Sequence, residues 1–215
     1  MSCNSIHKIF SSIFTLLYCL SVKGQYFKND LSINFNPTIS SFYGNPDLTD
    51  FKSRLTFSIG TTYSHYCSEG VFLQLGMLLE RKGANVDIDF FDGNGNYYKT
   101  STITFNRDYL VVPIVCSFVT HTKVKFYYGG GVYLGYLLRA NDINSYIFTK
   151  ESFATETERF DFGIKLGIGF FIPVGDRFLL DFGLHDNLGL HNTLINELAT
   201  RNNTIFLQMG LKYKF

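Results

Sequence analysis

The chain has 215 residues, a formal net charge of +1, 46% hydrophobic residues and no tryptophan. This length suits one domain, and the near-neutral charge offers none of the clustered positive charge with which proteins bind nucleic acid. Aromatic residues, all Phe or Tyr, make up 17% of the chain, and 19 residues are glycine. In an exported protein, this composition is typical of an all-β fold with aromatic girdles at membrane interfaces.

The N-terminal segment has the pattern of a secretory signal. Lys8 supplies a positive charge, residues 9–20 form an apolar stretch, and cleavage is expected before Gln25. The apolar stretch is shorter than the roughly 20 residues that a spanning helix needs. We therefore predict a signal peptide over residues 1–24 and a single mature domain over residues 25–215.

Cleavage would change both the charge and the cysteine content. Lys8 and Lys23 would be lost without any acid, so the formal charge would move from +1 to −1. The remaining cysteines are Cys67 and Cys116, too few for a disulfide framework. A bridge between them stays open, but two free thiols are the expectation. No cysteine, histidine or acid cluster predicts a metal or cofactor.

Period-two alternation of apolar and polar residues predicts about eight strands in the mature chain. In chain order, these strands are expected over residues 31–35, 54–64, 71–82, 98–118, 124–138, 160–172, 178–185 and 204–215. Residues 36–52, 140–159 and 186–203 are rich in polar and turn-forming residues and are predicted to be long loops.

The final strand has the two faces expected of a barrel wall, one apolar and one polar. Its apolar face consists of Ile205, Leu207, Met209, Leu211, Tyr213 and Phe215. The opposite face carries lysines, which suits a barrel wall with lipid outside and a polar lumen inside. The strand over residues 160–172 has the same alternation. A one-residue slip there would turn Lys165 toward lipid at a cost of roughly 2–4 kcal/mol.

Connection lengths also alternate: those after the first, third, fifth and seventh strands are long, and the others are short. This sorting predicts an eight-stranded antiparallel up-and-down transmembrane β-barrel with a filled lumen, short periplasmic turns and both termini in the periplasm. Residues 92–95, Asp-Gly-Asn-Gly, indicate a hairpin turn that ends a long external hairpin. A calcium loop beginning at Asp92 would need glycine and an acid where Tyr97 and Ile103 stand, so the turn is preferred.

Charged residues at inward positions define a predicted lumen network. Its members are Glu80, Lys82, Lys125, Arg139, Asp161, Lys165, Asp181 and Lys212. The preferred interpretation is a packed, charge-balanced interior in which inward glycines leave room for Tyr127, Tyr133 and Lys165. A proton or ion path is the alternative.

The order of several short motifs resembles the PorT-like outer-membrane β-barrel proteins of the Bacteroidota. The matching stretches are residues 73–83, 109–113, 129–135, 160–163 with Gly167 and Gly169, 188–192 and 210–215. Together they extend over essentially all of the mature chain. One departure is Gly76, where members of the family often carry a glutamate.

This resemblance implies an integral outer-membrane protein of a Gram-negative cell, inserted by the barrel-assembly machinery. That machinery reads a C-terminal strand with a terminal aromatic, a signal that Gly210, Tyr213 and Phe215 would supply here. The founding member of the family is tied to a protein-secretion system, which makes envelope or secretion-complex proteins the expected partners of the external loops. Outer-membrane lipid is the other expected partner.

The primary hypothesis is therefore a non-enzymatic structural or accessory component of the envelope. One alternative is a lipid-modifying acyl hydrolase or transferase on a small barrel. It would use His185, Asp186 and His191 with Ser145 or Ser152, although no nucleophile motif is present. A soluble periplasmic β-sandwich that binds a small ligand is the other alternative.

Overall fold

In the computed structural model, the described residues are 29–44, 51–144, 150–151, 158–193 and 200–215. The predicted signal peptide over residues 1–24 and its cleavage site before Gln25 lie outside these ranges. Within them, no helix is both long enough and apolar enough to cross a membrane.

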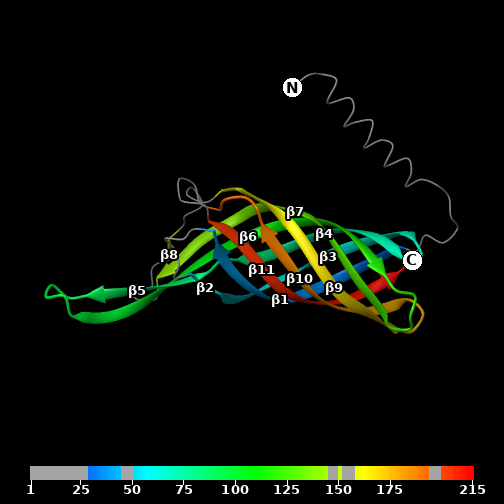
Figure 1. Cartoon of the computed structure of the whole chain (residues 1–215), viewed down its shortest axis with the longest axis horizontal. Coiled ribbons are helices and arrows are strands. Elements are labelled where there is room, and N and C mark those ends of the chain that lie inside the picture. The colour runs from blue at the N-terminus through cyan, green and yellow to red at the C-terminus, as the bar shows by residue number, and fades with distance from the viewer. Residues whose placement is uncertain (1–28, 45–50, 145–149, 152–157, 194–199) are drawn as a thin grey trace, which may run out of the picture.

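One antiparallel sheet closes on itself to form the barrel (Figure 1). Its eight strands are β1 (Asn29–Tyr43), β3 (Arg54–Ser68), β4 (Val71–Lys82), β6 (Tyr97–Val119), β7 (Lys125–Asn144), β9 (Phe160–Val174), β10 (Phe178–Gly189) and β11 (Arg201–Lys214). The short strands β2 (Phe51–Lys52), β5 (Asn85–Phe91) and β8 (Lys150–Glu151) are attached beyond the wall. The predicted eight-stranded barrel is confirmed, whereas the sandwich alternative, which needs two separate sheets, is wrong.

Closure joins the first and last strands, as the sequence predicted. Leu31 lies opposite Tyr213 and Phe35 lies opposite Met209 across the β1–β11 pair. At its end, Asn29 and Phe215 exchange two backbone hydrogen bonds, of 3.1 and 2.9 Å. Each of the eight strands therefore has a partner on both sides, and the wall has no open edge.

Several strands extend into segments that were predicted to be loops. Residues 36–43 continue β1, where Asn36, Thr38 and Ser40 are buried in the lumen and Ile39 lies outside. Strands β7, β10 and β11 likewise extend to Asn144, to Gly189 and back to Arg201. The predictions failed because inward positions of a polar lumen carry the same Asn, Ser and Thr that mark surface loops.

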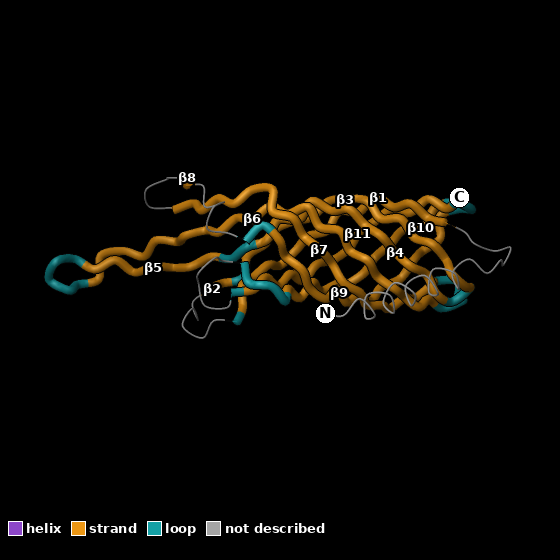
Figure 2. The backbone as a smooth tube through the Cα atoms, turned by 90° about the horizontal axis from the view of Figure 1, so that it is seen from above, coloured by secondary structure: helices purple, strands orange, loops and turns teal. Residues whose placement is uncertain are grey.

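The two ends of the barrel differ in the length of their connections. The short turns after β3, β6 and β9 gather at the end where β1 begins and β11 finishes. The opposite end carries the long connections, and there β5 and the first part of β6 form a hairpin that projects well beyond the wall (Figure 2). The predicted sorting of connections is confirmed.

The outer wall is apolar and has aromatic pairs toward both ends. Phe118–Tyr128, Phe126–Phe170 and Phe178–Tyr213 lie toward the end with short turns, and Tyr136–Phe160 lies toward the hairpin end. Exposed aliphatic side chains occupy the region between, including Met77, which is 57% exposed. This is the surface of a barrel whose solvent is hydrocarbon, with aromatic girdles at both interfaces.

A charge placed on the middle of this wall tests the assignment. Replacing Met77 with lysine should cost roughly 2–4 kcal/mol of unfolding free energy in lipid vesicles, because the ammonium would face hydrocarbon. Its neighbour on β3, Thr61, offers no counter-charge. Urea unfolding in vesicles measures the change, and Tyr98→Lys on the exposed hairpin is the control. Equal stabilities of the two variants would contradict a lipid-facing position for Met77.

Candidate functional site

The lumen holds most of the charged residues that the sequence grouped together. Glu80, Lys82, Asp161, Lys165, Asp181 and Lys212 are all buried there, at no more than 3% exposure. They occupy inward positions on β4, β9, β10 and β11, whose outward neighbours are apolar except for Arg81, between Glu80 and Lys82. Lys125 differs because it is only half-buried, at the start of β7 near the short turns.

Arg139 lies on the outer wall, so its predicted place in the lumen is wrong. The pairing of β6 with β7 shifts at this point: Asp108 is opposite Arg139, but Tyr109 is opposite Leu137. Leu138 is therefore an extra residue, and both Leu138 and Arg139 are exposed before Ala140 returns to the interior. A bulge of this kind resets the inside–outside alternation and cannot be seen from period-two counting.

Lys82 is the central cation in the part of the lumen nearer the projecting hairpin. Its Nζ lies 2.9 Å from Asp161 Oδ2 and 3.8 Å from Glu80 Oε1. The same ammonium lies over the Tyr133 ring, 4.4 Å from its centroid, which adds a cation–π contact. Lys82 is thus surrounded by two carboxylates and an aromatic face.

Neutral side chains also donate hydrogen bonds to those two acids. Glu80 accepts hydrogen bonds from Thr204 at 2.7 Å and from Asn187 at 3.1 Å. Asp161 accepts one from Asn202 at 3.0 Å. Buried carboxylates are tolerated when they are both paired and hydrogen-bonded in this way.

A second cluster surrounds Asp181, nearer the end with short turns. Its carboxylate accepts hydrogen bonds from the Tyr127 hydroxyl at 3.0 Å and from Gln208 Nε2 at 2.7 Å. The same hydroxyl lies 3.1 Å from His185 Nε2, and the His185 ring stacks on Phe206. The histidine is therefore part of the packed interior.

Two further lysines are held over aromatic rings. Lys165 Nζ lies 4.3 Å from the centroid of Phe206, and Lys212 Nζ lies 4.4 Å from that of Phe171 and 3.1 Å from Ser64 Oγ. Among the described residues, neither ammonium lies within 4.0 Å of a carboxylate oxygen. Ring faces thus take the place of direct counter-ions for these two lysines.

Sequence reasoning missed two buried charges, Asp30 and Arg107, each 1% exposed. Asp30, which accepts a hydrogen bond from Tyr66 at 2.9 Å, precedes the expected start of the first strand by one residue. Its alternation with Ser32 was a usable signal. With both included, four acids and four cations are buried in the described part of the chain, so these charges balance.

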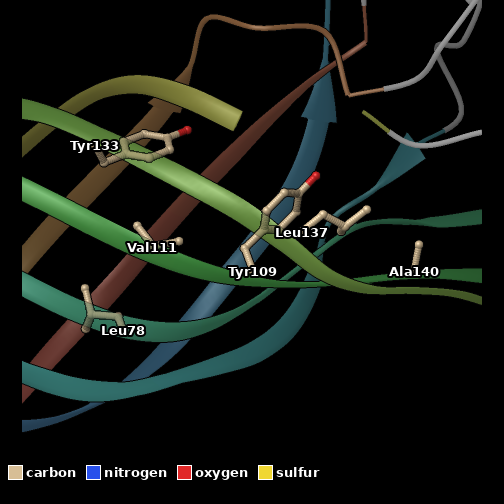
Figure 3. Packing of buried hydrophobic residues seen from close by; sticks show 6 residues of the cluster. All are labelled: Leu78, Tyr109, Val111, Tyr133, Leu137 and Ala140. Carbon is tan, nitrogen blue, oxygen red and sulfur yellow. The ribbon is translucent and has the colours of Figure 1, made fainter. Parts of the chain in front are cut away.

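Apolar and aromatic side chains pack among the polar groups of the lumen. One cluster consists of Leu78, Tyr109, Val111, Tyr133, Leu137 and Ala140, as Figure 3 shows. The other consists of Phe72, Val119, Tyr127, Phe171 and Leu179, with Tyr66 packed against it.

Inward glycines provide the space for the largest of these side chains. A Cβ on Gly169 would come within 2.5 Å of the Tyr127 hydroxyl, and one on Gly163 within 2.8 Å of the Tyr133 ring. A methyl group at either position would overlap the tyrosine. The tyrosines therefore occupy volume that only glycine leaves open, and the interior is packed as a core.

The residues considered for hydrolase chemistry do not converge. His185 faces the lumen and Asp186 faces the outer wall, because they are consecutive in β10. His191 packs against the outward Phe162 ring, and Ser145 and Ser152 lie outside the described residues. Within the described ranges, no group of three or more His, Cys, Asp or Glu residues is arranged to hold a metal ion.

The projecting hairpin has two different faces. On one, Thr102 and Thr100 donate hydrogen bonds to Asp87 and Asp89, at 2.6 and 2.5 Å. Lys52 also pairs with Asp87, at 2.6 Å, and so connects β2 to β5. The other face carries the alternate residues of β5, Val86, Ile88 and Phe90, of which Phe90 is 40% exposed.

The tip of the hairpin is a turn closed by its own aspartate. Asp92 Oδ1 accepts the backbone N–H groups of Asn96 and Asn94, at 2.8 and 2.9 Å, and these bonds lower the pKa of Asp92. The stabilisation is present above the unfolded pKa and is lost as the pH falls through the lower folded value. Gly95 has a φ of 81°, which a turn glycine readily adopts. The predicted turn is confirmed.

The Lys82 cluster makes a quantitative prediction. Replacing Lys82 with methionine should destabilise the barrel by roughly 3–5 kcal/mol, because Glu80 and Asp161 would remain buried without a cation. Adding Asp161→Asn to Lys82→Met should cost less than the sum of the two single changes. Unfolding in vesicles measures both effects, and Lys125→Met at the half-buried position is the control. Additive losses would show that the groups do not act as one cluster.

Comparison with known protein families agrees with this architecture. The family model described as "Outer membrane protein beta-barrel domain" matches residues 25–194. No curated protein matches the chain. Similar solved structures include OprG from Pseudomonas aeruginosa, with 13% identity, a TM-score of 0.48, and 88% of this chain and 96% of that chain covered. Ail of Yersinia pestis has 14% identity and a TM-score of 0.45, with 88% and 100% covered. Because the family model extends over most of the sequence, the chain belongs to the outer membrane protein beta-barrel domain family and is an integral outer-membrane β-barrel protein.

Proposed function

We propose that the protein is a non-enzymatic structural or accessory component of the envelope, which uses its projecting hairpin to bind a partner protein. The observation that carries this proposal is the exposed aromatic tip of the hairpin. Phe91, Tyr97 and Tyr98 are 62%, 61% and 66% exposed, far from the wall that faces lipid. Aromatic side chains displayed together in water are typical of protein-binding surfaces.

The geometry of the hairpin supports a display role. Its strands pair from Asn85–Thr104 to Phe90–Lys99, and after a shift in register that skips Tyr98 the last pair is Phe91–Tyr97, so the tip is held on a paired ribbon. Phe91 and Tyr97 contact each other edge to face, with ring centroids 6.4 Å apart. That contact leaves most of both rings exposed, so cross-strand pairing alone does not account for the apolar surface.

The packed lumen supports a scaffold role for the barrel. Its acids are bonded to lysine, tyrosine, asparagine, glutamine and threonine side chains, and two apolar clusters fill the remaining space. Through these contacts, the polar groups of the lumen are bonded to one another and are part of a packed interior. They favour the filled-lumen interpretation over a proton or ion path.

We further infer the orientation and the route to the membrane. The signal peptide over residues 1–24 would direct export, and the termini and short turns would lie in the periplasm. The long connections and the hairpin would then face outward, as in bacterial barrels of this type. The resemblance to PorT-like proteins of the Bacteroidota suggests that the partner belongs to an envelope or protein-secretion complex.

The hairpin proposal is tested by removing its aromatic tip without disturbing the ribbon. Triple substitution of Phe91, Tyr97 and Tyr98 by serine should abolish cross-linked co-purification of the partner from native membranes. The barrel itself should remain folded, because these side chains lie outside it. The control is His121→Ser with Lys123→Ser, in an exposed turn at the opposite end. An unchanged set of co-purified proteins with the triple variant would overturn the proposal.

Phe215 is proposed to be part of the signal for the barrel-assembly machinery, together with Gly210 and Tyr213. Deleting Phe215 should lower the amount of inserted barrel severalfold while leaving synthesis and export unchanged. The fraction of protein with heat-dependent gel mobility measures insertion. Phe126→Ala is the matched control, because it removes another exposed ring at the same end, 57% exposed, away from the C-terminus. Equal insertion of the two variants would refute the assignment.

A further inference from the structure

The outer wall is hollowed where the bulge in β7 lies beside β3, β4 and β6. The hollow is a groove of about 360 Å³. Its lining includes Phe57, Ile59, Leu79, Arg81, Leu138 and Arg139. These six side chains face outward from the barrel, so the groove opens to the surroundings of the wall. Asp108 and the buried residues Glu80 and Tyr109 complete its lining.

The bulge creates the charged part of the groove. Without the extra residue at Leu138, strict alternation would place Arg139 inside, as the sequence suggested. The shifted pairing instead puts Arg139 opposite Asp108 on the outer surface. Asp108 is already engaged by Arg81, whose Nε and Nη2 lie 2.6 and 3.1 Å from its two carboxylate oxygens. Two guanidinium groups thus face one carboxylate.

Arg139 is the cation in excess. It is exposed, and within the described residues it forms no ion pair. Arg81 is held in place twice, by its bidentate bond to Asp108 and by the Phe57 ring, 5.8 Å from its Cζ to the ring centroid. An anion in the groove would therefore contact two guanidinium groups. That of Arg81 is fixed, and that of Arg139 has no counter-ion among the described residues. Planar guanidinium groups bind phosphate oxygens with matched geometry.

The lower part of the groove is apolar. Phe57, Leu79 and Leu138 are 47%, 52% and 53% exposed and continue the lipid-facing wall. The neighbouring Tyr136–Phe160 pair belongs to the aromatic girdle toward the hairpin end, where a barrel meets lipid headgroups. The charged part of the groove thus lies at headgroup depth, and its apolar part lies at the depth of acyl chains.

We propose that this groove binds a phosphorylated lipid of the surrounding leaflet. The phosphate would lie on Arg139 and Arg81, and an acyl chain would pack over Leu79 and Leu138. The charge excess and the apolar wall beneath it select an anion that carries a hydrocarbon chain. This site depends on membrane insertion and is independent of the partner proposed for the hairpin.

Native mass spectrometry of the full-length barrel in a neutral detergent tests the site. The probes are lipid A, phosphatidylglycerol, uncharged diacylglycerol and inorganic phosphate, each at the same concentration. At least one of the two phosphorylated lipids should bind, and diacylglycerol and inorganic phosphate should not. Arg139→Gln should reduce the bound fraction about fivefold, in line with the contribution of one arginine near an anionic membrane surface.

Two further variants make the result specific. Arg159→Gln, another exposed arginine at the same end of the barrel, should bind lipid like the unaltered protein. Asp108→Asn should bind more, because it removes the competing carboxylate and frees Arg81. Heat-dependent gel mobility checks that each variant is folded. Equal losses for Arg139→Gln and Arg159→Gln would overturn the proposal. Binding of diacylglycerol as strong as that of the phosphorylated lipids, or of inorganic phosphate in place of them, would do the same.

Discussion

The structure depends on a single constraint: backbone N–H and C=O groups that face hydrocarbon have no water to bind. A sheet satisfies this constraint only when it has no edge, so β1 must pair with β11 and β6 must pair with β7. The two backbone hydrogen bonds between Asn29 and Phe215 complete the closure at one end. Everything else in the chain is fitted to this cylinder: apolar side chains outside, polar and small ones inside.

Closure has a second consequence: the polar groups that point into the lumen need partners there, and side chains provide them. Polar groups that point inward are removed from water as fully as those of a soluble core. Six of the inward ionisable residues, Glu80, Lys82, Asp161, Lys165, Asp181 and Lys212, are stabilised by each other, by amides and hydroxyls, and by ring faces. Glycines opposite Tyr127 and Tyr133 supply the missing volume. The interior is therefore both charge-balanced and close-packed.

The sequence was sufficient for the strands but insufficient for their ends and partners. Alternation predicted β4 over Val71–Lys82 without error and identified the wall-facing residues of β9. It failed over residues 36–43, because lumen-facing Asn, Thr and Ser look like loop residues. It misplaced Arg139, because nothing in the local sequence marks the bulge at Leu138. It could group the lumen charges but could not pair Lys82 with Asp161, since that contact depends on barrel geometry.

The separation of the lumen partners along the chain has a consequence for how the barrel folds. Lys82 and Asp161 are 79 residues apart, Glu80 and Thr204 are 124 apart, and Ser64 and Lys212 are 148 apart. Such contacts give a high contact order, and they form only when strands from both halves of the chain are already in register. The contacts of the interior therefore stabilise the completely assembled barrel and contribute little stability to a partly formed sheet. Folding should be slow and cooperative, with the polar interior discriminating against strands that have slipped by one residue.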